Sequence, residues 1–233
     1  MLFHRRIRRS HYHRNRAAGF PDAHPGFFSA HPACFSKKVN GHHLILGELA
    51  DYLTGSVVPD THDERYRQKI ARLLIEDKGF AKNEIESRIT LTVQAGDKKG
   101  VIPVDFKIIL HDRFHNRPHN RSHNQAGMVI KYGPGSLITR HRPVLAVSRL
   151  LEPCQIPVVV VTNGEDADIL DGATGKVTGS GFARIPCRSV LEKIMDAVSF
   201  APISKERAEK EGRIVYAYEV DGSCPCDDTI CRV

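Results

Sequence analysis

Residues 89–110 read ITLTVQAGDKKGVIPVDFKIIL, and this stretch decides the fold class that the sequence indicates. It opens with isoleucine, leucine and valine in alternation with threonine, which is the pattern of a strand with one buried face. Two glycines within 96–100 mark a turn, and an apolar run follows from 101 to 110. The stretch therefore predicts a β-hairpin.

The segments on either side of the hairpin predict a mixed fold. Upstream, apolar spacing predicts helices over 42–53 and 62–78, the second of which begins with Thr61 and Glu64 as a capping box. Downstream, segment 156–161 is apolar throughout, which indicates a strand buried on both faces and a parallel neighbour reached through a crossover helix. The other expected elements are strands at 128–132 and 213–220, edge strands at 168–171 and 176–178, and helices at 140–151, 189–198 and 204–211. This order predicts an α/β fold, a mixed sheet flanked by helices.

The charge of the chain is concentrated at its start. The net charge is +7, and residues 1–40 contain eight lysines and arginines but one acidic residue, so the remainder is neutral. We expect 1–40 to be a basic, disordered arm, with a transit peptide or an over-extended gene start as the alternatives. Residues 41–200 are expected to form one domain with a His/Asn/Arg-rich loop at 111–126, and residues 201–233 a helix, a strand and a cysteine-rich tail.

Several classes of protein are excluded by the pattern of apolar residues. No apolar run approaches the roughly 18 residues that a membrane helix needs. The first forty residues also lack the apolar stretch of a secretory signal. A cytoplasmic protein without a membrane partner is therefore expected.

Five segments together carry a family resemblance. They are ERYRQKIARLL (64–74), KGFAKNEIESRI (78–89), VDFKIIL (104–110), VIKYGPGSL (129–137) and VVVVTNG (158–164). In this order they resemble the N-terminal domain of the R subunit of type I restriction enzymes, over roughly residues 60–190. That domain belongs to the PD-(D/E)xK nuclease superfamily. The resemblance implies a restriction-endonuclease-like fold, DNA and other subunits as partners, and Mg²⁺-dependent cleavage of DNA.

The family pattern assigns three catalytic residues in this chain. Glu86 falls at the position of the first carboxylate, Asp105 on the second strand and Lys131 on the third. Carboxylate oxygens suit Mg²⁺, so Asp105 and Glu86 would hold the metal while Lys131 stabilises developing charge. The sequence departs from the family at Val129, which replaces the acidic residue of the E-x-K motif and lies on the same strand face as Lys131. We therefore expect a weakened site.

The cysteines near the end of the chain form a second candidate site. Cys224, Cys226 and Cys231 lie within eight residues, and thiolates at such spacing could bind Zn²⁺ or an iron–sulfur cluster. The alternative is a set of exposed, reduced thiols. Histidines recur every four residues from His111 to His123, and we interpret this tract as a low-complexity insertion in preference to a metal site.

Three functions follow from these patterns. The first is a DNA-binding domain with Mg²⁺-dependent endonuclease activity, and the second is a catalytically inactive module that binds nucleic acid or a partner. The third is a zinc or iron–sulfur protein that uses the terminal cysteines. The valine at position 129 favours the second function over the first.

Overall fold

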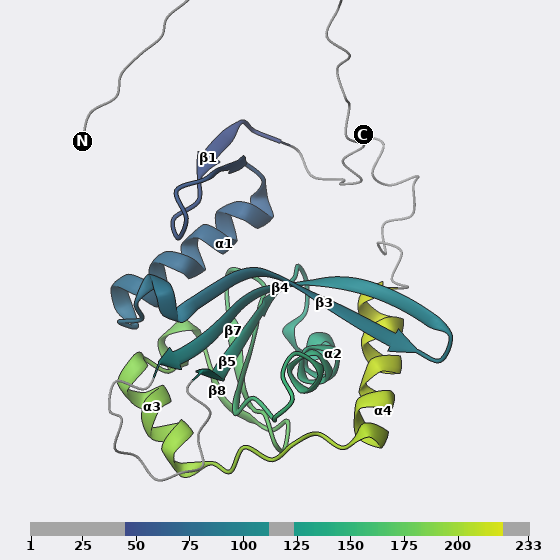
Figure 1. Cartoon of the computed structure of the whole chain (residues 1–233). Coiled ribbons are helices and arrows are strands. Elements are labelled where there is room, and N and C mark those ends of the chain that lie inside the picture. Colours follow the sequence, from purple (N-terminus) through teal and green to yellow (C-terminus); the bar gives the residue numbers. More distant parts are fainter. Residues whose placement is uncertain (1–44, 112–123, 221–233) are drawn as a thin grey trace, which may run out of the picture. The chain divides into compact units, whose positions relative to one another are not determined.

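The computed structural model describes residues 45–111 and 124–220 (Figure 1). Within these ranges the main sheet has six strands in the order β3-β4-β5-β6-β7-β8, and all neighbours are antiparallel except β5 and β6. The strands are β3 (Ile85–Ala95), β4 (Lys98–His111), β5 (Asn124–Tyr132), β6 (Val158–Thr162), β7 (Ala167–Asp171) and β8 (Val177–Ser180). The expected α/β fold with a mixed sheet is confirmed, although β7 lies inside the sheet and not at its edge.

The described helices cover both faces of this sheet. They are α1 (His62–Arg72), α2 (Leu137–Leu150), α3 (Arg188–Ala197) and α4 (Lys205–Val215), with short helical turns η1 (Leu73–Asp77), η2 (Lys82–Glu84), η3 (Phe182–Arg184) and η4 (Tyr216–Val220). Figure 1 shows α1 and α3 on one side of the central strands and α2 and α4 on the other. Two hydrophobic layers result, one under α1 and α3 and one under α2 and α4.

The parallel pair β5 and β6 lies at the centre of the sheet, as the sequence predicts. Every residue of β6 is buried, and α2 provides the crossover between the two strands. The uninterrupted apolar run reflects this burial, because a strand covered on both faces has no solvent side on which polar residues would be favourable.

The sheet divides at one point, which we call the fork. The ladder between β4 and β5 ends at the pair Phe106 and Ile130, whereas the ladder between β3 and β4 continues to Ala95 and Lys98. The residues of β4 that precede Phe106 therefore pair with β3 alone and no longer with β5. Asp105 and Lys131 are the next residues on the two strands, so the fork opens between them.

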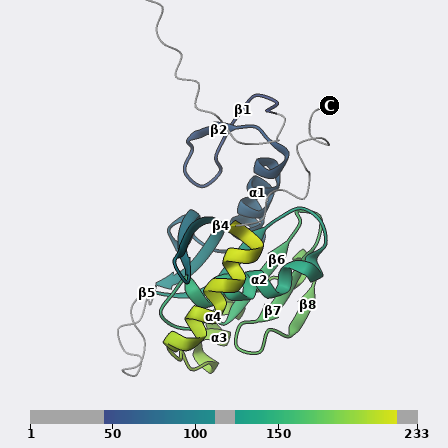
Figure 2. The same cartoon turned by 90° about the vertical axis from the view of Figure 1, so that its right-hand side faces the viewer.

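A buried ion pair joins α2 to α4, the two helices seen crossing in Figure 2. Arg149 of α2 donates to the carboxylate of Glu211 at 2.8 Å, and these side chains are 5% and 3% exposed. The Arg149 guanidinium also reaches the carbonyl oxygens of Gly172 and Ala173. Helix α4 packs on the same face of the sheet as α2, and η4 follows α4 directly in the chain. The ion pair between α2 and α4 therefore also helps to position η4 beside the fork.

Two predicted elements are wrong. The described part of the expected helix 42–53 contains a strand, β1 (Glu48–Ala50), which pairs with β2 (Val57–Pro59). The turn between them is held by Asp51, whose carboxylate accepts from the backbone N–H groups of Leu53 and Thr54. Such local side-chain bonds stabilise a turn at the expense of a helix.

The segment 213–220, expected as a strand, is helical. The segment is rich in β-branched and aromatic residues, which favours a strand, but its residues complete α4 and form the π-helical turn η4. Glu211, Gly212 and Val215 are all buried, and a helix brings these three positions to one face, whereas a strand would turn the neighbours Glu211 and Gly212 to opposite faces. Tertiary packing has overridden the local pattern.

Several expected features lie outside the described residues. They are the basic arm 1–40, most of the histidine tract, and Cys224, Cys226 and Cys231. Among the helices that are described, none is both long and apolar enough to cross a membrane.

Candidate functional site

Asp105 occupies the centre of a buried polar cluster beside the fork. Its side chain is 5% exposed. Its Oδ1 accepts from Nε of Arg67 at 2.6 Å, and its Oδ2 accepts from the backbone N–H of Tyr132 at 2.7 Å. The second bond replaces the ladder bond that the N–H of Tyr132 would make if β4 and β5 had not separated. Both oxygens of the carboxylate are thus engaged.

Helix α1 brings a second carboxylate to the same cluster. The helix begins after Thr61, whose side chain accepts from the backbone N–H of Glu64 as the sequence predicts. The Glu64 carboxylate itself points inward and accepts from Gln68 at 2.7 Å and from Arg88 at 2.6 Å. Since Arg67 lies three residues after Glu64, its Nη1 also approaches Glu64 Oε2 at 3.5 Å. Arg67 therefore bridges α1 and β4.

Arg88 of β3 completes the cluster from an unusual backbone conformation. Its φ of 55° is the one positive value at a non-glycine residue in the described chain. The pairing of β3 with β4 skips Arg88 and Asp105 without a change of register. In this conformation Arg88 bonds both Glu64 and Asp51, the latter at 3.0 Å. Such strain costs on the order of 1–3 kcal/mol and persists only where the surrounding contacts hold it.

The charges of the cluster stabilise one another. Burial would raise the pKa of Asp51, but hydrogen bonds from the Thr54 backbone, Arg88 and Gln68 outweigh it and hold that pKa at about 2. Burial would lower the pKa of Arg67, but the carboxylates around it, with Asp105 first among them, raise it above its ordinary value. Asp51, Arg67 and Arg88 are therefore held in their charged forms at neutral pH.

Lys131 faces the other side of the sheet. It is 5% exposed, and its Nζ lies 3.0 Å from Oε2 of Glu219 and 3.3 Å from the carbonyl oxygen of Pro103. The turn η4 covers the fork on this side, where a β-carbon at Gly100 would clash with Val220. A carboxylate from η4 thus pairs with the lysine.

The three residues predicted as catalytic are only partly brought together. Asp105 and Lys131 lie on adjacent strand positions across the fork, but their side chains pair with groups on opposite sides of the sheet. Glu86 is separate, because its carboxylate is half exposed and pairs with Lys107 at 2.8 Å. Lys107 in turn contacts Glu152 at 2.7 Å.

The surroundings of Asp105 do not suit a Mg²⁺ ion in this conformation. Val129, at the position of the second expected carboxylate, is fully buried in the hydrophobic layer under α2 and α4. The cavity beside Asp105 and Arg67 measures about 10 Å³, which is room for a single water molecule at most. Mg²⁺ usually keeps several of its waters, and the Arg67 guanidinium would repel it. No group of three or more His, Cys, Asp or Glu residues within 45–111 and 124–220 is placed to hold a metal.

Sequence reasoning missed Arg67, Arg88 and Glu219. The sequence predicted that Thr61 and Glu64 form a capping box, and the Thr61 bond is confirmed, whereas the Glu64 carboxylate bonds inward to Gln68 and Arg88. The spacing of three residues between Glu64 and Arg67 is the one local signal of its inward position. The other contacts join residues far apart in the chain, such as Arg67 and Asp105, which are 38 positions apart. No pattern in the sequence indicates the positive φ of Arg88.

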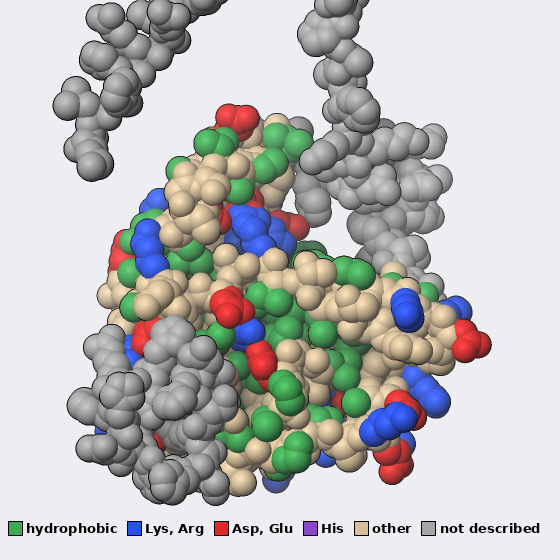
Figure 3. All heavy atoms as spheres, viewed as in Figure 1, with side chains coloured by type: hydrophobic (Ala, Val, Ile, Leu, Met, Phe, Trp, Pro, Cys, Tyr) green, Lys and Arg blue, Asp and Glu red, His purple; other side chains and the backbone are tan. Residues whose placement is uncertain are grey.

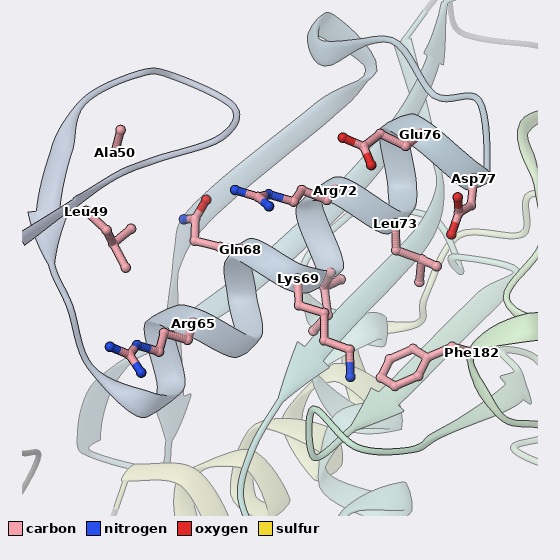
Figure 4. Close-up of a pocket in the computed structure, with 11 residues that line it drawn as sticks. Leu49, Ala50, Arg65, Gln68, Lys69, Arg72, Leu73, Glu76, Asp77 and Phe182 are labelled. Atoms are coloured by element: carbon pink, nitrogen blue, oxygen red, sulfur yellow. The ribbon is translucent and has the colours of Figure 1, made fainter.

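A larger groove lies on the other face of α1, between this helix and β1 (Figure 4). Its volume is about 730 Å³. Arg65, Lys69 and Arg72 lie along one helical face and are exposed, and Leu49 lines the opposite wall. Lys69 also lies 5.0 Å from the ring centre of Phe182. Two acids, Glu76 and Asp77, lie at one end of the groove.

Lysine and arginine side chains do not form one continuous surface on the face of the domain that Figure 3 shows. On the face shown in Figure 3, lysine and arginine side chains lie in small groups among acidic and hydrophobic ones. This agrees with the neutral net charge of the chain beyond residue 40. The row of cations on α1 is therefore a local feature.

One comparison with known proteins gives a match. The family described as Type I restriction enzyme R protein N terminus matches residues 62–186, which is more than half of the chain. The matched stretch begins with α1 and ends just before α3, so it contains both sides of the fork. No curated protein and no solved structure matches the chain.

Proposed function

The chain belongs to the family of type I restriction enzyme R protein N termini, and from this membership we propose that it is a DNA-binding domain that does not cut DNA. It would act in the cytoplasm, together with partner subunits. The observation that supports the absence of cleavage most strongly is the engagement of both Asp105 oxygens by Arg67 and the Tyr132 backbone. A carboxylate in this state lacks the free oxygens and the space that a hydrated metal requires.

The groove beside α1 supports the DNA-binding part of the proposal. Arg65, Lys69 and Arg72 span about 10 Å of helix, and a row of cations along one helical face fits a DNA backbone, which carries a phosphate at every step. Arg65 has Asp60 as its partner through two hydrogen bonds, at 2.6 and 2.8 Å, but its own side chain is 54% exposed and stays open to solvent. A phosphate could compete for the guanidinium. The contacts would be independent of base sequence.

A Mg²⁺-dependent nuclease is the second candidate function. It is favoured by the position of Asp105 and Lys131 on adjacent strand positions at the fork, which fits the family pattern. This candidate requires that Arg67 and Glu219 release these two residues, and that Glu86 or another carboxylate joins Asp105 at the metal.

The groove can be tested by removing two of its cations. We expect the double variant Arg65→Gln/Arg72→Gln to bind a short DNA duplex more weakly, with a log–log salt slope smaller by about 2 units, because two phosphate contacts are lost at about 0.9 unit each. Fluorescence anisotropy at several salt concentrations measures both quantities. The matched control is Lys193→Gln/Lys210→Gln, which removes the same charge from α3 and α4.

Two results would count against the proposal. Equal weakening by both double variants would show that net charge alone decides the affinity and that the groove is not the contact. A full chain that does not bind duplex DNA at low salt, even at the roughly 10⁻⁴ M typical of weak non-specific binding, would remove DNA as the partner.

A further inference from the structure

Three buried carboxylates converge beside the fork from three different elements. Asp51 comes from the turn after β1, Glu64 from α1 and Asp105 from β4, and each is 5% exposed or less. Buried charges are stable only when paired and hydrogen-bonded, so three acids at one place require positive charge among them. In many proteins a metal ion supplies that charge.

Here the positive charge comes from two guanidinium groups. Arg88 joins Asp51 to Glu64, and Arg67 joins Glu64 to Asp105. A guanidinium holds its donors in a rigid plane, so it can bridge two carboxylates with a fixed geometry. The Arg67 group also lies 5.7 Å from the ring centre of Tyr132, which is directly beside the fork.

We propose that Arg67 is the resident cation of this domain, in the place where a divalent metal ion would otherwise bridge α1 and the fork. The Asp105 carboxylate reaches across the fork to the N–H of Tyr132, so the Arg67 bridge ties the helix to both separated strands. It follows that wild-type protein needs no metal for its structure. It also follows that loss of the guanidinium creates a metal site from Glu64 and Asp105. The inference does not depend on DNA binding.

The space required for this change is available once the side chain is shortened. The Arg67 side chain is 26% exposed, so a cation and its waters could reach the two carboxylates from solvent. Both acids are hard oxygen ligands, which suits Mn²⁺ and Mg²⁺. The backbone N–H of Tyr132 would still orient Asp105.

The test compares Arg67→Ala with wild-type protein in EDTA and in millimolar Mn²⁺. For wild-type protein we expect the same Tm in both solutions. For Arg67→Ala we expect a Tm about 5 °C or more lower in EDTA, since a largely buried ion pair has lost its cation, and a recovery of at least half of this loss in Mn²⁺. Electron paramagnetic resonance should show bound Mn²⁺ in the variant alone.

Two further variants make the result specific. Arg65→Ala removes a guanidinium from the exposed face of the same helix and should show no response to Mn²⁺. Arg67→Ala/Asp105→Asn should lose the recovery, because the metal has lost a ligand. If Arg67→Ala does not fold in EDTA, it is refolded with and without Mn²⁺, and rescue by the metal supports the proposal. Equal Mn²⁺ binding by wild-type protein and Arg67→Ala, or no response of Arg67→Ala in either experiment, would overturn it.

Discussion

Replacing Glu211 by glutamine is expected to lower the free energy of unfolding by about 3 kcal/mol. Glu211 is 2% exposed and pairs with Arg149 at 2.8 Å and with Arg142 at 2.6 Å. Burial would raise the pKa of Glu211, but the two arginines outweigh it and lower that pKa, so the group is ionised in the folded protein. Without the negative charge, Arg149 is left as a buried cation without a counter-ion, which typically costs about 3–5 kcal/mol. Glutamine retains an acceptor oxygen, so we expect the lower end of this range.

Urea denaturation of Glu211→Gln measures this loss, and helix α4 provides its own control. Glu206 is 78% exposed and pairs with Lys210 one turn later on the same helix. Glu206→Gln makes the identical chemical change at the surface and should cost no more than about 0.5 kcal/mol. Similar losses in the two variants would mean that the pair between α2 and α4 does not hold α4 in place.

Removal of residues 1–40 is expected to produce the largest change in DNA binding. This segment carries the whole net charge of +7, while the remainder of the chain is neutral. If the arm makes even four phosphate contacts, its loss lowers the log–log salt slope by about 3 to 4 units. Anisotropy titrations of the full chain and of residues 41–233 give the two slopes. An unchanged slope would place the DNA contact on the neutral domain, where the groove beside α1 is the candidate.

The central sheet could be predicted from the sequence because its signals are local. Alternation over 89–93 and the glycine-containing turn define the hairpin, and the unbroken valine run of β6 indicates a strand buried on both faces. Elsewhere the pattern was ambiguous. Apolar residues at 45, 49 and 53 fit a helix as well as a strand. The structure forms a strand and a turn there, and the turn depends on the hydrogen bonds of one side chain, Asp51.

The candidate site was predictable only in part. The resemblance to the family motif assigned Asp105 and Lys131 to the second and third strands of the sheet, and it also identified Val129 as the position that lacks the expected carboxylate. Their partners could not be foreseen, because Arg67 and Glu219 reach them through the packing of α1 and α4 on opposite faces of the sheet. Whether Asp105 faces a metal or a guanidinium depends on that packing.

The central claim is that this domain binds DNA but does not cleave it, because the Arg67 guanidinium occupies the place beside Asp105 where a catalytic metal ion would bind. The most direct measurement incubates the full chain with supercoiled plasmid in Mg²⁺, in Mn²⁺ and in EDTA, and follows binding by mobility shift and nicking by gel electrophoresis. We predict that the chain binds the plasmid in EDTA as well, so that binding requires no metal, and that none of the three solutions gives nicked product beyond that of a protein-free control. Nicking that requires the metal and disappears in Asp105→Ala would contradict it, and would show that Asp105 can leave Arg67 to bind a catalytic ion.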